Sequence, residues 1–377
     1  MIEHYLDNSA TTPVLPAAAQ KALELMTREY GNPSSLHTLG FRAREEVETA
    51  RRAVAGALGA QPEEITFTSG GTESNNLALF GAAAALRRRG DHIVTTAVEH
   101  DSVLQAVAQL EKEGFRVTRL APDRQGHIAP EAVAEAIEEK TVLVSLMLVN
   151  NETGALHPVE AAARALRRKK APGLVHVDAV QAFGKLAFTP ARLGADLVTV
   201  SGHKVHAPKG VGALYHRRGV HLLPRAFGGG QEKGLRSGTE SVPLIGAFGT
   251  AVEDLPRPEE TLPRIAALRD RLVTGLRQLP GVEINSPEDG LPYVVNFSAG
   301  TVRAETMLHF LSRQGVYVSA GSACGKAAPS HVLTAMGLPA ERIASALRVS
   351  FSRFSTPEDV DALLAALAQG LGSLQRE

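Results

Sequence analysis

The sequence has 377 residues, and its 40 Lys+Arg balance its 40 Asp+Glu to a formal net charge of +0. The lack of a basic excess excludes a general nucleic-acid binder or a protein held on anionic membranes, so we expect no direct nucleic-acid or membrane partner. No run approaches the ~18 apolar residues of a membrane span, the N-terminus has no secretory signal, and the single cysteine excludes an internal disulfide. We therefore expect a cytoplasmic globular protein.

Two helices are predicted before the first strand. Residues 1–14 show no periodicity and are predicted to be extended or irregular. Residues 16–30 have helical spacing, with Pro16 tolerated in the first turn. After a polar loop at 31–40, residues 41–58 predict a strong amphipathic helix, with Glu and Arg side chains at helical spacings.

The first predicted strand leads into a glycine turn. Residues 65–69 predict a strand, and Gly70, Gly71 and Thr72 follow it before an apolar helix that runs to about Arg89. Free N–H groups and the dipole at a helix start favour an anion, and glycine lets the backbone approach it closely. The segment matches neither common phosphate motif. Taken alone, it is as consistent with a glycine turn capped by Thr72 as with a phosphate cradle.

Strands and helices then alternate along the chain. The apolar run at 142–149 is typical of a parallel strand covered on both faces. The rhythm predicts βαβ units, and so an α/β fold with a mostly parallel sheet between helices. The predicted strands are 92–96, 116–121, 142–149 and 174–180, and the predicted helices are 102–113, 130–139 and 159–170.

Polar residues follow several of these strands at the point where each strand ends. In parallel sheets the ligand site lies outside the carboxyl ends of the strands. We therefore expect the following residues to converge on one edge of the sheet: Gly71/Thr72, His100, Asn151, Asp178/Gln181 and Ser201/His203/Lys204.

The stretch 196–215 places Lys204 between two predicted strands, at 197–200 and 211–215. Lysine is rarely buried without a partner. Lys204 is therefore either a solvated lysine at a strand end, or an amine in a cleft whose pKa is lowered so that it attacks a carbonyl. Such a lysine carries a Schiff base, and pyridoxal phosphate (PLP) is its commonest cofactor partner. That interpretation requires a phosphate cradle, an acid for the ring nitrogen and a flat partner for the ring.

The last third of the chain predicts a smaller α+β domain. A glycine-rich polar loop from Phe227 leads into a helix that ends near Leu255, and its length suggests a functional or subunit-contacting loop rather than a plain surface loop. Prolines at 256 and 258 mark a boundary, so we expect a large domain at 15–256 and a small domain made of 1–14 and 257–377. The small domain is predicted to contain helices at 261–279, 305–314 and 357–371, strands at 282–284, 293–297, 316–319 and 347–351, and a small-residue loop at 320–325 with Cys324.

Ten motifs, in order along nearly the whole chain, resemble the NifS/IscS cysteine desulfurases, which are fold-type I, class V PLP enzymes. The resemblance implies an aminotransferase-like fold with a large PLP-binding domain and a small domain carrying the catalytic cysteine. The motifs are YLDNSATT (5–12), NPSSLHTLG (32–40), FTSGGTESNN (67–76), EH (99–100), NNETG (150–154), HVDAVQ (176–181), SGHK (201–204), GGGQE (228–232), RSGTE (236–240) and SAGSAC (319–324).

The resemblance implies that the strand-end residues hold one cofactor, PLP. Lys204 would carry it as a Schiff base, and His100 would stack on its ring and take part in catalysis. Asp178 would pair with the ring nitrogen and Gln181 would bond the ring oxygen. The phosphate would be held by residues of both subunits of a homodimer with shared sites: Gly71, Thr72, Ser201 and His203 from one subunit and Thr239 from the other. No metal site is predicted.

The resemblance also implies the reaction. Asn151 and Arg348 would bind the substrate carboxylate, for which Arg348 offers a planar and always charged fork. Cys324 would take the sulfur of L-cysteine as a persulfide, leaving L-alanine. An acceptor protein would then receive the sulfur for iron–sulfur clusters, tRNA thiolation or thio-cofactors. A lone cysteine is otherwise a small buried hydrophobe, but the Gly, Ser and Ala neighbours of Cys324 favour an exposed loop.

Other functions stay open. Another class V enzyme, such as a selenocysteine lyase, a cyst(e)ine lyase or a small aminotransferase, would not need Cys324 on a mobile loop. A PLP-binding regulator or a non-catalytic sulfur-transfer adaptor could keep the cradle without turnover, but a regulator would need a DNA-binding segment that the sequence does not offer. Two departures from the family pattern also stand out. His206-Ala207 replaces an aromatic and a glycine near Lys204, and the longer tail with which some members hold an iron–sulfur scaffold protein is not expected after the last helix.

Overall fold

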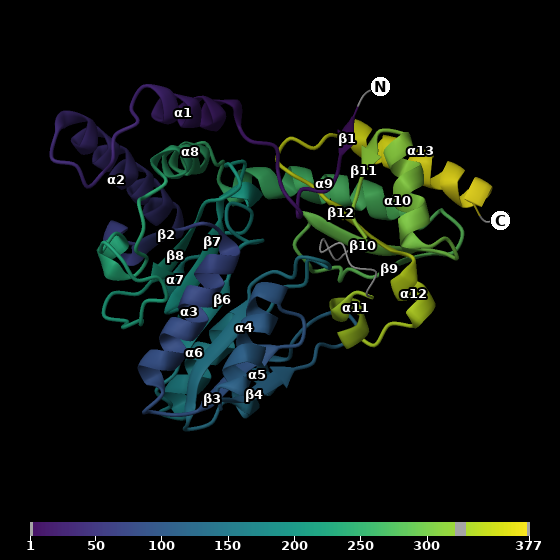
Figure 1. The fold of residues 1–377 in the computed structure, drawn as a ribbon. Coiled ribbons are helices and arrows are strands. Elements are labelled where there is room, and N and C mark those ends of the chain that lie inside the picture. Colours follow the sequence, from purple (N-terminus) through teal and green to yellow (C-terminus); the bar gives the residue numbers. More distant parts are fainter. Residues whose placement is uncertain (1–2, 321–328, 375–377) are drawn as a thin grey trace.

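The structure is a computed structural model that describes residues 3–320 and 329–374. Figure 1 shows a large α/β body on the left and a smaller body on the right. The smaller body contains both the N-terminal strand and the C-terminal helix, so the two ends of the chain lie in the same part of the molecule.

A seven-stranded sheet forms the centre of the large body, in the order β2-β8-β7-β6-β5-β3-β4. The pairs among β7, β6, β5, β3 and β4 are parallel, whereas β8 is antiparallel to both β2 and β7. The predicted α/β fold with a mostly parallel sheet is confirmed. The strands are β2 (Ile65–Thr68), β3 (His92–Thr96), β4 (Arg116–Leu120), β5 (Thr141–Met147), β6 (Leu174–Asp178), β7 (Leu197–Ser201) and β8 (Gly212–His216).

Helices cover both faces of this sheet. Successive side chains of a strand point to opposite faces. Ile93 and Leu143 pack in one cluster with α3 and α4, while their neighbours Val94 and Val144 pack in another cluster with α5 and α6. The short α7 lies beside α6. The helices are α3 (Gly71–Leu86), α4 (Asp101–Lys112), α5 (Pro130–Ala136), α6 (Val159–Arg168) and α7 (Pro190–Leu193).

Three further helices pack together at the edge of the large body: α1 (Pro16–Thr27), α2 (Thr38–Leu58) and α8 (Val242–Glu253). Helix α2 begins three residues earlier than predicted because His37 caps it, with the His37 ring accepting from the N–H of Gly40 at 3.3 Å. It ends at Gly59, whose φ of 66° is left-handed and suits glycine. Short 3₁₀ turns lie at Pro62–Glu64, Gly202–Lys204 and Glu232–Gly234.

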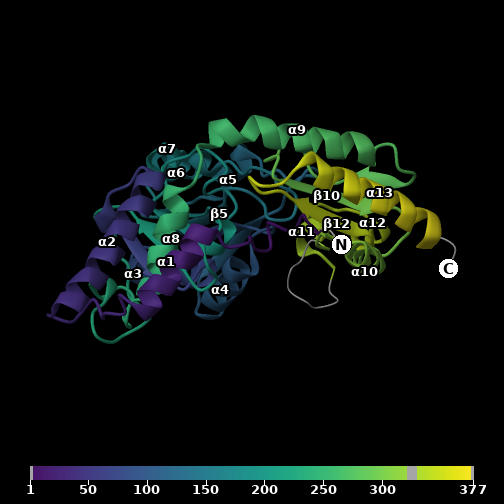
Figure 2. The ribbon, with the colours of Figure 1, turned by 90° about the horizontal axis from the view of Figure 1, so that it is seen from above.

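The smaller body contains a three-stranded antiparallel sheet in the order β12-β10-β9 and a parallel pair of β1 with β11. Helices α9 and α13 pack against each other along its outside (Figure 2). The pairing of β1 was not predicted, because two residues carry too little periodicity to signal a strand. The elements are β1 (His4–Tyr5), α9 (Pro258–Leu276), β9 (Val282–Ile284), β10 (Val294–Ala299), α10 (Ala304–Arg313), β11 (Val316–Tyr317), α11 (His331–Ala335), α12 (Ala340–Ala344), β12 (Ala346–Ser350) and α13 (Pro357–Leu374).

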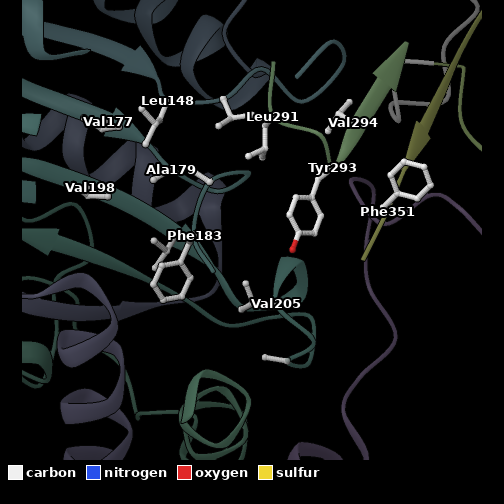
Figure 3. Packing of buried hydrophobic residues seen from close by; sticks show 14 of the residues in the cluster. Leu148, Val177, Ala179, Phe183, Val198, Val205, Leu291, Tyr293, Val294 and Phe351 are labelled. Atoms are coloured by element: carbon white, nitrogen blue, oxygen red, sulfur yellow. The ribbon is translucent and has the colours of Figure 1, made fainter. Parts of the chain in front are cut away.

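One hydrophobic cluster runs from the large sheet into the smaller one. Figure 3 shows Phe183 and Val205 of the large body on one side and Tyr293 and Phe351 of the smaller body on the other. The two bodies therefore share a core, which fixes the groups that each one contributes to the space between them. Within residues 3–320 and 329–374, no helix is both long and apolar enough to span a membrane.

The packing of α8 on α2 leads to a stability prediction. A Cβ added at Gly249 would lie 2.7 Å from Ala50 Cα, a backbone atom of α2. We expect Gly249→Ala to cost about 1–3 kcal/mol of stability, although alanine in a helix is normally about 1 kcal/mol better than glycine. The thermal unfolding midpoint should fall.

Gly56→Ala, in the exposed part of α2, is the matched control. Nothing lies within 4 Å of a Cβ added there, so its midpoint should rise. A Gly249→Ala midpoint at or above that of the wild type would contradict the close packing of α2 and α8.

Candidate active site

A cavity of about 270 Å³ lies at the carboxyl ends of β5, β6 and β7. It is also bordered by the first turn of α3, the residue before α4, the N-terminal segment and β12. The strand-end side chains meet here, as the parallel topology requires. Of the predicted site residues, those that line it are Gly71, Thr72, His100, Asn151, Asp178, Gln181, Ser201, His203, Lys204 and Arg348.

Two predicted site residues are not brought to this cavity by the described structure. Thr239 is exposed on the loop before α8 and does not line the cavity of its own chain. Cys324 lies outside the described residues.

The amine of Lys204 is held by the N-terminal segment. It donates to the carbonyl oxygens of Ser9 at 2.5 Å and Ala10 at 2.8 Å. Burial, together with the positive charges of Lys185 and Arg348, lowers the pKa of Lys204 from 10.5 to about 7. A large fraction of this amine is therefore neutral and nucleophilic near neutral pH.

The carboxylate of Asp178, at the end of β6, is held in a fixed orientation. Its Oδ2 accepts from Asn75 Nδ2 at 2.8 Å, and its Oδ1 accepts from the N–H of Val180 at 3.0 Å. The side chain is only 6% exposed. A buried, oriented carboxylate on the cavity wall is suited to pair with a protonated ring nitrogen.

The anion cradle is formed by the start of α3 and the end of β7. The first N–H groups of α3, at Gly71 and Thr72, have no acceptor within the helix. Ser201 Oγ is buried and has no hydrogen-bond partner among the described residues. A Cβ at Gly71 would lie 3.1 Å from Val180 Cγ2, so a larger residue here would press on the wall of the cavity. Unused donors at a helix start fit the phosphate of PLP.

His203, next to Lys204, is largely neutral. Burial lowers the pKa of His203 to about 4, and the positive charges of Lys204, Lys209 and Lys185 act in the same direction. Its Nδ1 lies 3.3 Å from Thr11 Oγ1. A neutral imidazole still offers one N–H to an anion, which is compatible with the phosphate role expected for this residue.

Arg348 reaches the cavity from β12 of the smaller body and is 1% exposed. It donates to Asp7 Oδ1 at 2.8 Å and to the carbonyl oxygen of Asn151 at 3.0 Å. These contacts orient the guanidinium at the cavity wall, where a planar cation suits a substrate carboxylate.

The amide of Gln181 is oriented by two neighbours. Its Nε2 donates to the carbonyl oxygen of Ser9 at 3.0 Å, and its Oε1 accepts from Lys185 Nζ at 3.3 Å. Lys185 has donors only, so it holds the Oε1 end and leaves the amide N–H groups for Ser9 and the cavity. Burial lowers the pKa of Lys185 to about 8, and the charge of Arg348 adds to that shift.

Residue-by-residue reasoning on the sequence missed several of these supporting groups. The carbonyls of Ser9 and Ala10 lie in the motif YLDNSATT and Asn75 lies in FTSGGTESNN, so membership of a motif was the only available signal. Lys185 lies outside every motif, and nothing in its spacing marks it.

His206 and Ala207, which depart from the family pattern after Lys204, both pack into the structure. His206 adopts a left-handed φ of 65° and its ring packs edge-on against Phe354 at 4.9 Å. Its Nδ1 lies 2.9 Å from the carbonyl oxygen of Pro13, and Ala207 is buried. His206 thus ties the lysine turn to the N-terminal segment.

The sequence and fold were compared with known proteins. Residues 4–363 match the family described as aminotransferase class-V. Cysteine desulfurase IscS of Methanosarcina thermophila is 42% identical over 369 residues, which cover 97% of this chain and 91% of that relative. Among solved structures, a NifS-like protein has a TM-score of 0.91 and 39% identity, covering 98% of this chain and 100% of that one. SspA in complex with cysteine has a TM-score of 0.83 and 34% identity, covering 94% and 100%.

The lowered pKa of Lys204 predicts how cofactor-free protein reacts with added PLP. Only a neutral amine attacks an aldehyde, and this amine becomes neutral through about pH 7, whereas an ordinary lysine does so near pH ~10.4. Trapping with borohydride and peptide mapping should place the pyridoxyl group on Lys204, with a rate that levels off above about pH 8.

Lys209, exposed on the same loop, is the internal control and should stay largely unlabelled. Preferential labelling of Lys209, or a Lys204 rate that rises only above about pH 9, would contradict this account of the amine.

Proposed function

The chain belongs to the class V aminotransferase family and to its cysteine desulfurases, and on that premise we propose that it converts L-cysteine to L-alanine and keeps the sulfur as a persulfide on Cys324. Enzymes of this family depend on PLP, which is therefore the cofactor. The observation that carries the proposal is the single cavity in which Lys204, Asp178 and Arg348 meet. An amine, a carboxylate and a guanidinium so placed suit the cofactor carbonyl, the ring nitrogen and an amino-acid carboxylate.

The cofactor, when bound, supplies an electron sink for the substrate Cα. Lys204 would hold the cofactor through its carbonyl carbon and would move the proton of the substrate Cα. Asp178 keeps the ring nitrogen protonated, and Gln181 donates to the ring oxygen. The donors at Gly71, Thr72, Ser201 and His203 hold the phosphate, which is supported by the buried, unused Ser201 Oγ. His100 stacks on the ring and exchanges protons with the reacting groups.

The substrate is oriented by its carboxylate. Arg348 binds it with a planar fork, and Asn151 lies beside that guanidinium at the cavity wall. The contact with Asp7 restrains Arg348 before substrate arrives, which reduces the entropy lost on binding.

Cys324 performs the sulfur chemistry. Its thiolate forms a bond to the substrate sulfur as the bond between that sulfur and Cβ breaks. The electron pair of the broken bond stays with the carbon, which takes a proton and becomes the methyl group of alanine. The persulfide then passes to an acceptor protein for iron–sulfur clusters, tRNA or cofactors.

A homodimer completes the site. Thr239 does not line its own chain's cavity, and large apolar side chains are exposed on the segments around it and around α1 and α2. Leu36 and Phe227 are each 83% exposed, which would be costly if these side chains stayed in water. We infer that these segments meet in the dimer and that Thr239 reaches the phosphate of the partner's site. The other exposed apolar residues there are Leu23, Met26, Tyr30 and Phe41.

The domain division and the place of action are part of the same proposal. Residues 15–256 form the large PLP-binding domain, and 1–14 with 257–377 form the small domain that carries Cys324. The pairing of β1 with β11 supports grouping the N-terminal segment with the small domain. We place the enzyme in the cytoplasm, in keeping with its single cysteine.

Cys324→Ser separates the two halves of the reaction. A serine hydroxyl is a much weaker nucleophile than a partly ionised thiol, and the change in volume is small. The variant should keep the absorbance of bound PLP and still change it on addition of L-cysteine. Alanine production should fall by roughly a hundredfold or more, and mass spectrometry should find no persulfide.

Lys204→Ala is the complementary variant and should retain a free Cys324 thiol but give no turnover. Release of alanine and sulfide by Cys324→Ser at close to the wild-type rate would instead favour a direct elimination lyase.

The shared site predicts complementation between two inactive variants. In a mixed dimer of Lys204→Ala with Thr239→Ala, the site with an intact Lys204 receives an intact Thr239 from its partner. Mixed dimers, isolated with two different tags, should regain up to about half of the wild-type activity, because one of the two sites is whole. Activity no greater than that of either parent dimer would rule out sharing.

A further inference from the structure

A chain of hydrogen bonds runs from Asp178 through Asn75 and Ser102 to His100, buried at its first two links and part-buried where it reaches the imidazole. Asn75 is 1% exposed and Ser102 8%. Asn75 Nδ2 donates to Asp178 Oδ2 at 2.8 Å and to Ser102 Oγ at 2.8 Å. Ser102 Oγ lies 2.8 Å from His100 Nδ1, and the backbone N–H of Ser102 donates to the same nitrogen at 3.1 Å. The desulfurase roles proposed above use neither Asn75 nor Ser102.

The donor and the acceptor of each of these hydrogen bonds can be assigned, starting from Asp178. A carboxylate only accepts, so Asp178 must face the amide nitrogen of Asn75, which fixes the orientation of that amide. Its second N–H points to Ser102 Oγ. The one hydroxyl proton of Ser102 is then left to be donated to His100 Nδ1.

The backbone imposes the same condition on the imidazole. The N–H of Ser102 cannot accept, so His100 Nδ1 must be unprotonated to receive it. His100 is the N-cap residue of α4, and this acceptor role satisfies a free N–H of the helix start. A neutral His100 must therefore carry its proton on Nε2. That is the ring edge left to face the cavity that His100 lines.

We propose that Asn75 and Ser102 are positioning residues that hold His100 as the Nε2–H tautomer, so that it presents a proton donor to the reacting groups. The inference rests on the proposed catalytic role of His100 and adds which ring nitrogen acts. A single amide, Asn75, then orients both the carboxylate that faces the ring nitrogen of the cofactor and the hydroxyl that selects the tautomer of the imidazole.

The tautomer is testable without cofactor or substrate. Solid-state NMR of ¹⁵N-histidine-labelled, cofactor-free protein distinguishes protonated from unprotonated ring nitrogens, and His100→Gln identifies the signals of His100. We expect the proton on Nε2 and an Nδ1 signal typical of a hydrogen-bond acceptor. A proton on Nδ1 of wild-type His100 overturns the proposal.

The effect on turnover is tested in the PLP-loaded enzyme. Ser102→Ala should lower kcat by about fivefold or more, the loss expected for one hydrogen bond, with KM and cofactor absorbance unchanged. Ser102→Thr keeps the hydroxyl and should restore kcat. Gln105→Ala, on the exposed side of α4, is the control for the helix itself and should act like the wild type.

A Ser102→Ala kcat within about twofold of the wild type overturns the positioning role. Failure of the desulfurase function has a separate signature, because wild-type enzyme would then form no alanine whatever the NMR spectra show.

Discussion

The amine of Lys204 is held at the cavity wall by the N-terminal segment, and the rest of the site depends on that placement. Burial and the neighbouring charges together shift its pKa from 10.5 to about 7, which disfavours the charged amine by about 5 kcal/mol. The carbonyls of Ser9 and Ala10 replace the lost water contacts and leave the amine at a defined place. The N-terminal segment therefore positions the nucleophilic amine, although it lies far from Lys204 in the sequence.

The charged side chains that act on this amine balance in number, two positive against two negative. Lys185 and Arg348 both act on Lys204, while Asp7 and Asp178 are the carboxylates that offset them. The free donors at the start of α3 and the guanidinium of Arg348 are therefore what suits these walls to anions, rather than an excess of positive charge.

The sequence could predict the location of the site because the carboxyl ends of parallel strands share one edge. This rule places Asn151, Asp178 and Lys204 together without knowledge of any contact. It could not find Ser102 or Ser9, since their roles arise from hydrogen bonds between segments whose approach is set by tertiary packing. The start of α2 was misplaced for a related reason, because the capping residue is His37 and not one of the common capping types. The strand at His4–Tyr5 is defined by its pairing with β11, more than 300 residues later in the chain. A short stretch of sequence cannot predict a pairing with so distant a partner.

The joining of the first residues to the last strands has a consequence for biosynthesis. The segment that receives Lys204 pairs with β11 and bridges to Ser350 of β12, and Arg348 arrives on that same strand. A chain emerging from the ribosome can complete the large sheet early, since its strands are close in sequence order. The wall of the pocket that β12 provides is missing until this strand has been translated. Arg348 is therefore among the last residues of the cavity wall to be synthesised, whereas Asp178 and Lys204 are made earlier.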